Sequence, residues 1–367
     1  MPVNVVLIGP GLVGSAFLSQ LFAHQKRNVG PFVRVVAIAS SSKAVVAPAG
    51  IDLSNWKSSL AAHTDALAAA EAAATSASQS APTVVVDCTS SDAVAARYPS
   101  WLNSGLHIVT PNKKGFSGSI DLFNNIKNSQ KTGGEKGKRP LVFHESTVGA
   151  GLPILSTLED LVATGDEIVK IEGIFSGTLS YIFNNYSTAG GNAVPPKFSD
   201  IVNVAKELGY TEPDPRDDLN GMDVGRKVVI LGRVAGLPLS LDTLPIENIV
   251  PEPLRAIVSA DDFLKKLPEF DAHFAELNGK AKANGRVLRC VGVVDPINGS
   301  SVRLAEYDAS HPFAALKGSD NIIAFTTRRF PNPLIVQGAG AGDAVTAFGM
   351  FSDLLKIAAR VEYSSQQ

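Results

Sequence analysis

Short apolar runs alternate with amphipathic segments over the first forty or so positions of the chain. The runs Val3–Ile8 and 33–39 are continuous and rich in β-branched residues, a pattern typical of strands buried on both faces of a parallel sheet. Between them, apolar residues from Val13 to about His24 recur at helical spacing. A strand, a helix and a second strand in this order predict a βαβ unit with a right-handed crossover.

The same alternation continues to about residue 143. We expect further strands at 83–86, 107–109 and 141–143. The Ala- and Ser-rich segment predicts a surface helix over about 65–74, followed by a loose loop over 75–80. The basic, Gly-rich stretch 127–140 is interpreted as a solvated loop, although its charges could also bind an anion.

Polar motifs become dense after residue 144, so we place a domain boundary there. An amphipathic helix is predicted from after Gly221 to about Gly236, with Val224, Val228, Val229 and Leu231 on its buried side. Short alternating runs at 287–294, 301–304 and 322–325 predict a mixed or antiparallel sheet. A last apolar helix is expected over about 343–361.

A glycine motif follows the first predicted strand and opens the first predicted helix. Gly9, Gly11 and Gly14 match G-x-G-x-x-G, which allows a tight turn, close approach of a pyrophosphate and close packing of helix on strand. The first N–H groups of the helix, from Leu12 and Val13 onward, would face the phosphates. The pattern therefore predicts a dinucleotide-binding domain.

These features define the expected fold class. It is α/β, with an N-terminal Rossmann-type parallel sheet and a second α+β domain. The expected domains are 1–144, completed by 341–367, and 145–340. The glycine loop 338–342 could be a plain packing turn, or the last helix could return to the Rossmann domain and bring Gly342 near the cofactor.

The end of the second strand bears on the choice of cofactor. An Asp or Glu there would bind the ribose 2′-hydroxyl and repel a 2′-phosphate. The chain instead has three serines and Lys43, of which Ser40 and Lys43 are candidate contacts to the cofactor. We expect NADP(H) to be accepted, with NAD(H) as a further cofactor.

Composition excludes several other classes of protein. The 367 residues are 45% hydrophobic and 19% charged, with a formal net charge of −2, which excludes a disordered chain and indicates no nucleic-acid partner. No apolar run is long enough to cross a membrane, and no signal peptide is evident at the start. The two cysteines, Cys88 and Cys290, form no disulfide framework and favour a reducing compartment, so we expect a cytoplasmic protein.

Carboxylates are concentrated in one proline-stiffened stretch. It contains the acidic residues Glu212, Asp214, Asp217, Asp218 and Asp223. Asp223 and Lys227 lie four residues apart on the predicted helix and therefore on one face of it. Such a pair can be an ordinary surface ion pair, but here strongly apolar residues follow directly. A partly desolvated lysine beside a carboxylate can supply a proton in general acid catalysis.

The chain carries long motifs that resemble one enzyme family. They are the glycine motif at 9–14, Thr-Pro-Asn-Lys-Lys at 110–114, His-Glu-Ser-Thr-Val-Gly-Ala-Gly-Leu-Pro at 144–153, the segment 172–182 and Gly-Tyr-Thr-Glu-Pro-Asp-Pro-Arg-Asp-Asp at 209–218. The sequence resembles fungal homoserine dehydrogenase over essentially its whole length. It has no segment resembling aspartate kinase, so we expect the monofunctional type.

The resemblance implies an activity and its cofactors. The expected reaction is the NAD(P)H-dependent reduction of L-aspartate 4-semialdehyde to L-homoserine, a step toward threonine, isoleucine and methionine. The resemblance further implies a homodimer joined through the sheet of the second domain.

The same resemblance implies residue roles. Lys227 corresponds to the proton donor, and Glu212 to the ligand of the substrate ammonium, supported by Asp218 and Asp223. Lys113 corresponds to a lysine between cofactor and substrate.

Two loops of the first domain match further parts of the family's site. Thr89 and Ser90 correspond to the loop over the nicotinamide. Glu145 and the backbone oxygens of Val148, Ala150 and Leu152 correspond to a monovalent cation site, expected to hold Na⁺, since oxygen ligands suit a hard cation.

Two alternatives remain open. A semialdehyde dehydrogenase that works through a thioester would need a nucleophilic cysteine, either Cys88 or Cys290. A non-catalytic NADPH-binding regulator would keep the glycine motif but would need neither Lys227 nor Glu212.

Overall fold

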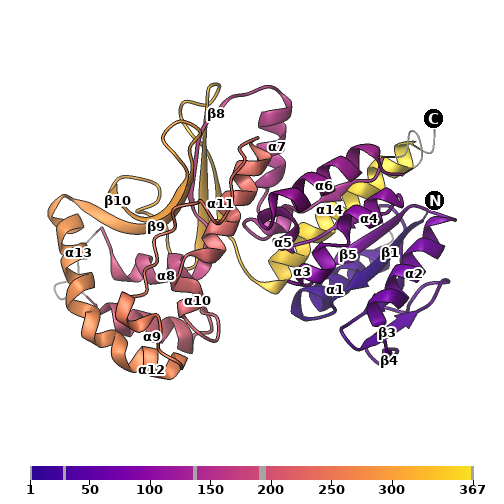
Figure 1. Cartoon of the computed structure of the whole chain (residues 1–367), viewed down its shortest axis with the longest axis horizontal. Helices are drawn as coiled ribbons and strands as arrows, with labels where there is room; N and C mark the ends of the chain where they lie inside the picture. Colours follow the sequence, from indigo (N-terminus) through magenta and orange to yellow (C-terminus); the bar gives the residue numbers. More distant parts are fainter. Residues whose placement is uncertain (1, 28–29, 135–138, 190–195, 365–367) are drawn as a thin grey trace. The chain divides into compact units, whose positions relative to one another are not determined.

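The computed structural model describes residues 2–27, 30–134, 139–189 and 196–364 and divides into two compact units (Figure 1). The first unit comprises Met1–Gly151 together with Gly342–Gln367, and the second comprises Leu152–Ala341. No helix within the described ranges combines the length and the apolar character needed to cross a bilayer.

A seven-stranded sheet forms the centre of the first unit, in the order β4-β3-β2-β1-β5-β6-β7. Its strands are β1 (Val3–Ile8), β2 (Val33–Ala39), β3 (Lys43–Val46), β4 (Ala61–Ala62), β5 (Thr83–Asp87), β6 (His107–Val109) and β7 (Val142–Phe143). Neighbouring strands pair in parallel along the series β2, β1, β5, β6 and β7, while β3 and β4 add an antiparallel edge next to β2. The predicted parallel Rossmann-type sheet is therefore confirmed.

Helices cover this sheet and bury its apolar side chains. They are α1 (Leu12–Arg27), α2 (Ala66–Ser78), α3 (Asp92–Ala95), α4 (Tyr98–Asn103), α5 (Lys114–Ser117), α6 (Ile120–Thr132) and α14 (Asp343–Ser364). All six residues of β1 are buried, as expected for a central strand covered on both faces. The last helix, α14, packs against α1, and the rings of Phe17 and Phe351 meet edge to face at 6.1 Å. The prediction that the last helix returns to this domain is confirmed.

Two predicted loops are wrong in part. The segment 75–78 is helical: α2 continues to Ser78, and near its end the Ala77 carbonyl accepts a hydrogen bond from Nδ2 of Asn4 on β1 at 3.2 Å. Helix α6 likewise extends to Thr132, with Phe123 and Ile126 buried, so the stretch predicted as a loop from 127 begins inside a helix. Residues 135–138 of that stretch lie outside the described part of the chain.

The second unit contains a five-stranded sheet in the order β10-β9-β8-β11-β12, and every pairing in it is antiparallel. The strands are β8 (Ile168–Ile174), β9 (Arg286–Val294), β10 (Ser301–Asp308), β11 (Asp320–Thr327) and β12 (Leu334–Ala339). The helices are α7 (Leu155–Ala163), α8 (Gly177–Tyr186), α9 (Phe198–Glu207), α10 (Arg216–Leu219), α11 (Met222–Val234), α12 (Ala260–Lys266) and α13 (Asp271–Ala283). Short 3₁₀ turns lie at Glu145–Thr147 in the first unit and at Glu252–Leu254 and Leu267–Phe270 in the second.

Helix α11 lies close against β9 because a glycine faces it. A Cβ added to Gly292 of β9 would lie 2.6 Å from Cγ2 of Val228, so only glycine leaves room for the helix. Val224, Val228 and Val229 are buried, as the amphipathic pattern predicts. The apolar side of α11 thus anchors the helix, and this anchoring fixes where Lys227 lies.

The division between the units falls after Gly151 rather than after residue 144. The segment 145–151 is tied to α14: the Glu145 N–H donates to Asp353 Oδ2 at 3.0 Å, and the Ser146 hydroxyl donates to the Thr346 carbonyl at 2.9 Å. Gly349 of α14 completes the contact, since a Cβ there would lie 2.3 Å from Ser146 Oγ. These long-range contacts hold the segment to the first unit.

Candidate active site

The glycine motif forms a tight turn between β1 and α1. Gly9 has a φ of +86°, and a Cβ on it would lie 2.8 Å from Thr89 Cγ2. A Cβ on Gly14 would lie 2.4 Å from the Gly9 carbonyl oxygen. A Cβ on Gly11, in contrast, would meet nothing within 4 Å, so open space lies above this backbone. The two outer glycines are needed for packing and the middle one leaves room for a phosphate, which fits a dinucleotide.

The helix start beside this turn is accessible. Leu12 is the first residue of α1 and is 80% exposed, and Val13 is half-buried. N–H groups in the first turn of a helix have no intrahelical partners and favour anions. Gln20 of α1 donates from Nε2 to the Ala344 carbonyl. This bond ties the start of α14, which follows Gly342, to α1.

The segment after β2 is a turn into β3. Ser40 Oγ accepts hydrogen bonds from the N–H groups of Ser42 and Lys43 at 3.3 and 2.9 Å, so this hydroxyl stabilises the turn itself. Ser41 and Lys43 are exposed. No carboxylate occupies positions 40–43, which leaves the turn compatible with a 2′-phosphate.

A buried carboxylate joins the two loops that follow β5 and β6. Asp87 is fully buried and accepts hydrogen bonds from Tyr98 Oη at 2.5 Å, Asn112 Nδ2 at 3.0 Å and the Thr89 N–H at 2.8 Å. Burial raises the pKa of Asp87, and these hydrogen bonds oppose that rise. The network holds the loop of Thr89 and the exposed Ser90 beside the loop that leads to Lys113, the residue before α5.

Lys227 is a buried cation of the second unit. It is 7% exposed, and its Nζ lies 2.7 Å from Asp223 Oδ2 and donates to the Phe175 carbonyl oxygen at 2.7 Å. The Asp223 side chain is 46% exposed, so the pair extends from the core toward solvent. The lysine therefore does not point into bulk solvent. An ammonium held between a carboxylate and a carbonyl can stabilise developing negative charge and donate a proton.

Within the acidic stretch 212–223, Asp218 interacts with both Glu212 and Asp223. Asp218 accepts hydrogen bonds from the Thr178 hydroxyl at 2.7 Å and from the Glu212 N–H at 2.8 Å. Burial raises the pKa of Asp218 to about 6, with the charges of Glu212 and Asp223 adding to the rise. These three acidic residues are therefore close enough to interact, whereas Asp214 instead pairs with Arg216 at 2.5 Å.

The loop 145–151 contains Glu145, Val148 and Ala150 of the expected cation site. Glu145 is 6% exposed, and its Oε2 lies 3.7 Å from Lys356 Nζ. Gly149 and Ala150 both adopt left-handed backbone conformations, with φ of 74° and 52°. Val148 and Ala150 are buried in this unit, and Leu152 is the first residue of the second unit. The donor set of one carboxylate and backbone carbonyls suits a hard cation, although Lys356 already supplies positive charge beside Glu145.

Comparison with known proteins places these features in a family. A family model described as homoserine dehydrogenase matches residues 153–355, and a second, described as the homoserine dehydrogenase NAD binding domain, matches residues 9–137. The chain is 47% identical to the homoserine dehydrogenase of Saccharomyces cerevisiae, over 98% of this chain and 99% of the relative. The chain belongs to the homoserine dehydrogenase family.

Other relatives of this homoserine dehydrogenase family member agree. The Schizosaccharomyces pombe homoserine dehydrogenase is 48% identical over 99% of this chain and 97% of the relative. A crystal structure from Candida auris, described as a protein of unknown function, superposes with a TM-score of 0.90 at 47% identity and covers 98% of this chain and 99% of its own. The chain is thus an NAD(P)-dependent oxidoreductase of amino-acid biosynthesis, and the prediction of a homoserine dehydrogenase is confirmed.

The two alternatives are not favoured. A family member identified over nearly its whole length is an enzyme rather than a regulator. A thioester mechanism would need a reactive thiolate. Burial raises the pKa of the Cys290 thiol to about 12 and also raises the pKa of Cys88, so neither thiol is activated.

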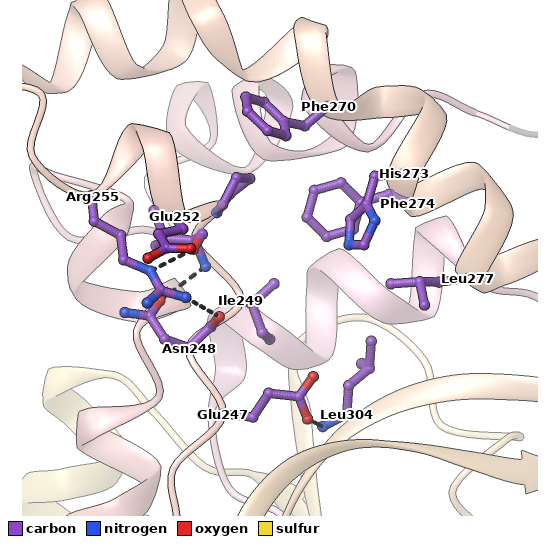
Figure 2. Close-up of a pocket in the computed structure, with 12 residues that line it drawn as sticks. Glu247, Asn248, Ile249, Glu252, Arg255, Phe270, His273, Phe274, Leu277 and Leu304 are labelled. Carbon is purple, nitrogen blue, oxygen red and sulfur yellow. Dashed lines mark hydrogen bonds between the residues drawn. The ribbon is translucent and has the colours of Figure 1, made fainter.

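The second unit contains a cavity of about 290 Å³ whose lining includes neither Lys227 nor the predicted substrate-binding residues (Figure 2). Its floor includes Phe274 and Leu277, and Arg255 at its edge donates to the Val250 carbonyl. None of the residues predicted for the reaction lines it, and its lining acidic residues, Glu247 and Glu252, are exposed. The cavity therefore does not mark the site of homoserine dehydrogenase chemistry.

Some residues of the site were not identified from the sequence. Thr178 lies in the motif 172–182, but nothing in the motif alone indicated that its hydroxyl binds Asp218. Phe175 contributes through its backbone carbonyl, for which side-chain identity carries no signal. Asp87 directly follows the buried strand run 83–86, and its position at a strand end could have suggested a functional role.

Proposed function

We propose that this homoserine dehydrogenase reduces L-aspartate 4-semialdehyde to L-homoserine with Lys227 as the general acid. The observation that carries the proposal is the buried Lys227 ammonium, held at 2.7 Å from both Asp223 and the Phe175 carbonyl. The reaction requires a donor at the aldehyde oxygen, and a preorganised ammonium in a site shielded from water is well suited to it.

The residues of the first unit fit a nicotinamide dinucleotide. Gly9, Gly11, Leu12, Val13 and Gly14 would hold its pyrophosphate through the turn and the start of α1. Further contacts would come from the strand-end and loop residues Ser40, Lys43, Thr89, Ser90, Lys113 and Gly342. When bound, NADPH or NADH supplies the hydride that reduces the aldehyde carbon.

Lys227 acts on the oxygen of the same carbonyl group. As negative charge grows on that oxygen, the ammonium stabilises it and then transfers a proton from Nζ. Asp223, at 2.7 Å, pairs with the Lys227 ammonium and orients it. In the oxidation of homoserine, the neutral amine accepts the hydroxyl proton, so both directions use the same residue.

The acidic residues select the amino group of the substrate. Glu212 is exposed and its carboxylate would bind the substrate ammonium, while Asp218, beneath it, adds negative charge and fixes the Glu212 backbone. Lys113 would contact the substrate from the cofactor side, as in the family the chain resembles. This charge pattern favours an α-amino aldehyde over a neutral one.

We further propose a monovalent cation, Na⁺, held by Glu145 and by the carbonyl oxygens of Val148, Ala150 and Leu152. The support is the oxygen-only donor set and the two consecutive left-handed residues in the loop.

We also propose a cytoplasmic homodimer that serves the synthesis of threonine, isoleucine and methionine. The dimer would form through the sheet of the second unit. Its edge strand β12 alternates exposed and half-buried residues, and Ile335 on it is 41% exposed. Light scattering coupled to size-exclusion chromatography would measure the mass directly.

The decisive experiment compares two lysines. Lys227→Ala should lower kcat about 10²- to 10⁴-fold, measured by NADPH absorbance, while NADPH binding measured by fluorescence is retained. Lys280→Ala is the matched control, because Lys280 also pairs with an acidic residue one helical turn before it, Glu276, but on an exposed surface. Turnover of Lys227→Ala within tenfold of wild type would remove Lys227 from the role.

A further inference from the structure

Asn321 and Lys227 donate hydrogen bonds to the same backbone carbonyl oxygen, that of Phe175. Asn321 belongs to β11 and is fully buried. Its Nδ2 donates to the Phe175 carbonyl oxygen at 2.9 Å, and the same oxygen accepts the hydrogen bond from Lys227 Nζ at 2.7 Å. A carbonyl oxygen has two lone pairs, so these two donors can satisfy it completely.

The orientation of the Asn321 amide is determined by this contact. Only the amide NH₂ can donate to a carbonyl, so Nδ2 must face Phe175 and Oδ1 must face away. Oδ1 is buried and has no hydrogen-bond partner within the described part of the chain. Leaving a buried acceptor unsatisfied is unfavourable, so the arrangement is retained at a cost to stability.

The backbone around Asn321 is shaped to accept it. A Cβ on Gly340 would lie 2.1 Å from both Cγ and Nδ2 of Asn321, so this position requires glycine. On the other side, Ile322 pairs with Ile174, the residue before Phe175, which brings the two strand ends together. Asn321 is therefore confined between two backbone segments, with its amide directed at the Phe175 carbonyl.

We propose that Asn321 is a positioning residue for Lys227, which it orients through the Phe175 carbonyl. This inference rests on the proposed role of Lys227. A lysine side chain has four rotatable carbon–carbon bonds, and two acceptors, Asp223 and the Phe175 carbonyl, hold its Nζ. Asp223 is partly exposed, so the buried carbonyl is the more rigid of the two. Asn321 fixes its direction.

The test is a double-mutant cycle on turnover. Asn321→Leu keeps the branching at Cγ and removes the donor, and we expect kcat to fall roughly 5- to 30-fold with KM for NADPH unchanged. In the Lys227→Ala background, the same substitution should change kcat less than twofold, because there is no ammonium left to position. Asn321→Ala, which removes the donor and adds no bulk, should show the same pattern if Asn321→Leu folds poorly.

Asn278→Leu is the matched control. Asn278 also donates from Nδ2 to a backbone carbonyl of the second unit, that of Tyr186 at 3.1 Å, but not at Lys227. This control should lower the melting temperature and leave kcat per folded enzyme unchanged.

The possible outcomes separate the two proposals. Equal losses of kcat from Asn321→Leu in both backgrounds, or wild-type kcat in the single variant, would overturn the positioning role while Lys227 remains the acid. A Lys227→Ala variant with near wild-type turnover would overturn the proposed function and the positioning role with it.

Discussion

The backbone N–H of Glu212 donates a hydrogen bond to Oδ2 of Asp218 at 2.8 Å. This bond spans six positions of a loop stiffened by two prolines, and it joins the backbone of the exposed Glu212 to the partly buried carboxylate of Asp218. The bond keeps residue 212 close to Asp218, and the charge of Glu212 contributes to the raised pKa of Asp218. It also couples the charge of one residue to the geometry of the other.

The affinity for homoserine should depend on the ionisation of Asp218. Because burial raises the pKa of Asp218 to about 6, the carboxyl is neutral at pH 5 and charged at pH 7. We expect KM for homoserine to fall as pH rises through about 6, since the charged form attracts the substrate ammonium. Asp218→Asn should remove this dependence of KM on pH. Asp217→Asn, on the exposed side of α10, should keep it. A dependence that persists unchanged in Asp218→Asn would assign it to another group.

Removing the Glu212 charge should weaken substrate binding. Glu212→Gln loses a charge-assisted hydrogen bond, which is worth about 1.5–3 kcal/mol, so KM for homoserine should rise about 10- to 100-fold. Turnover at saturation should change little. Glu207→Gln, an exposed acid in α9, is the control. An unchanged KM in Glu212→Gln would contradict its assignment.

Cofactor preference should depend on Lys43. The turn at 40–43 contains no carboxylate, so steady-state kinetics of the wild type should show efficient use of NADPH. Lys43→Glu should lower kcat/KM for NADPH by about tenfold and affect NADH less, because the new charge repels the 2′-phosphate. Lys57→Glu, exposed in the same unit, controls for net charge. A large preference of the wild type for NADH would defeat this prediction.

Arg289 should be essential for the stability of the second unit. It is 1% exposed, and its guanidinium donates to five backbone carbonyls, those of Phe183, Ser187, Leu288, Phe313 and Ala314. Arg289→Met would leave these acceptors unsatisfied and should lower the free energy of unfolding by about 3–5 kcal/mol.

The control for Arg289 lies on the same strand. Arg286 is 45% exposed at its side chain and pairs with Glu306 and Asp308 at the surface. Arg286→Met should cost less than about 1 kcal/mol in a denaturant titration. Equal effects of the two substitutions would show that burial of Arg289 is not the cause.

His107 should make the stability of the first unit depend on pH. Burial lowers the pKa of His107 from 6.5 to about 4, and its Nδ1 accepts the Leu141 N–H at 3.0 Å. The unfolded chain binds the proton more readily, so this contribution is complete above pH 6.5 and is lost as pH falls toward 4. It amounts to at most about 3 kcal/mol.

The difference between wild type and His107→Gln isolates this contribution. Glutamine can still accept the hydrogen bond but does not titrate in this range. Thermal unfolding between pH 4 and 7 should show a smaller loss of stability at low pH in the variant. The exposed His273→Gln should behave like wild type, and an identical profile for His107→Gln would disprove the prediction.

Local pattern was sufficient for much of the fold. The run 3–8 predicts β1 to the residue because a fully buried central strand must be continuously apolar. The glycine motif predicts the turn at Gly9, since a left-handed φ and a close approach there both require glycine. The end of α2 was harder to predict, because Ala, Ser and Thr suit helix and loop alike, and the contact near its end, from the Asn4 side chain to the Ala77 carbonyl, comes from a residue 73 positions away.

The sequence by itself determined the family, the reaction and the spacing of Asp223 and Lys227 on one helix face. That information is local or motif-based, and it does not depend on contacts between residues distant in the chain. Only the tertiary structure decided what Lys227 touches, because its carbonyl acceptor on Phe175 lies 52 positions away and Asn321 lies 146 positions from that carbonyl. Hydrogen bonds to a backbone carbonyl leave no trace in side-chain identity, so chain packing alone could bring these three groups together.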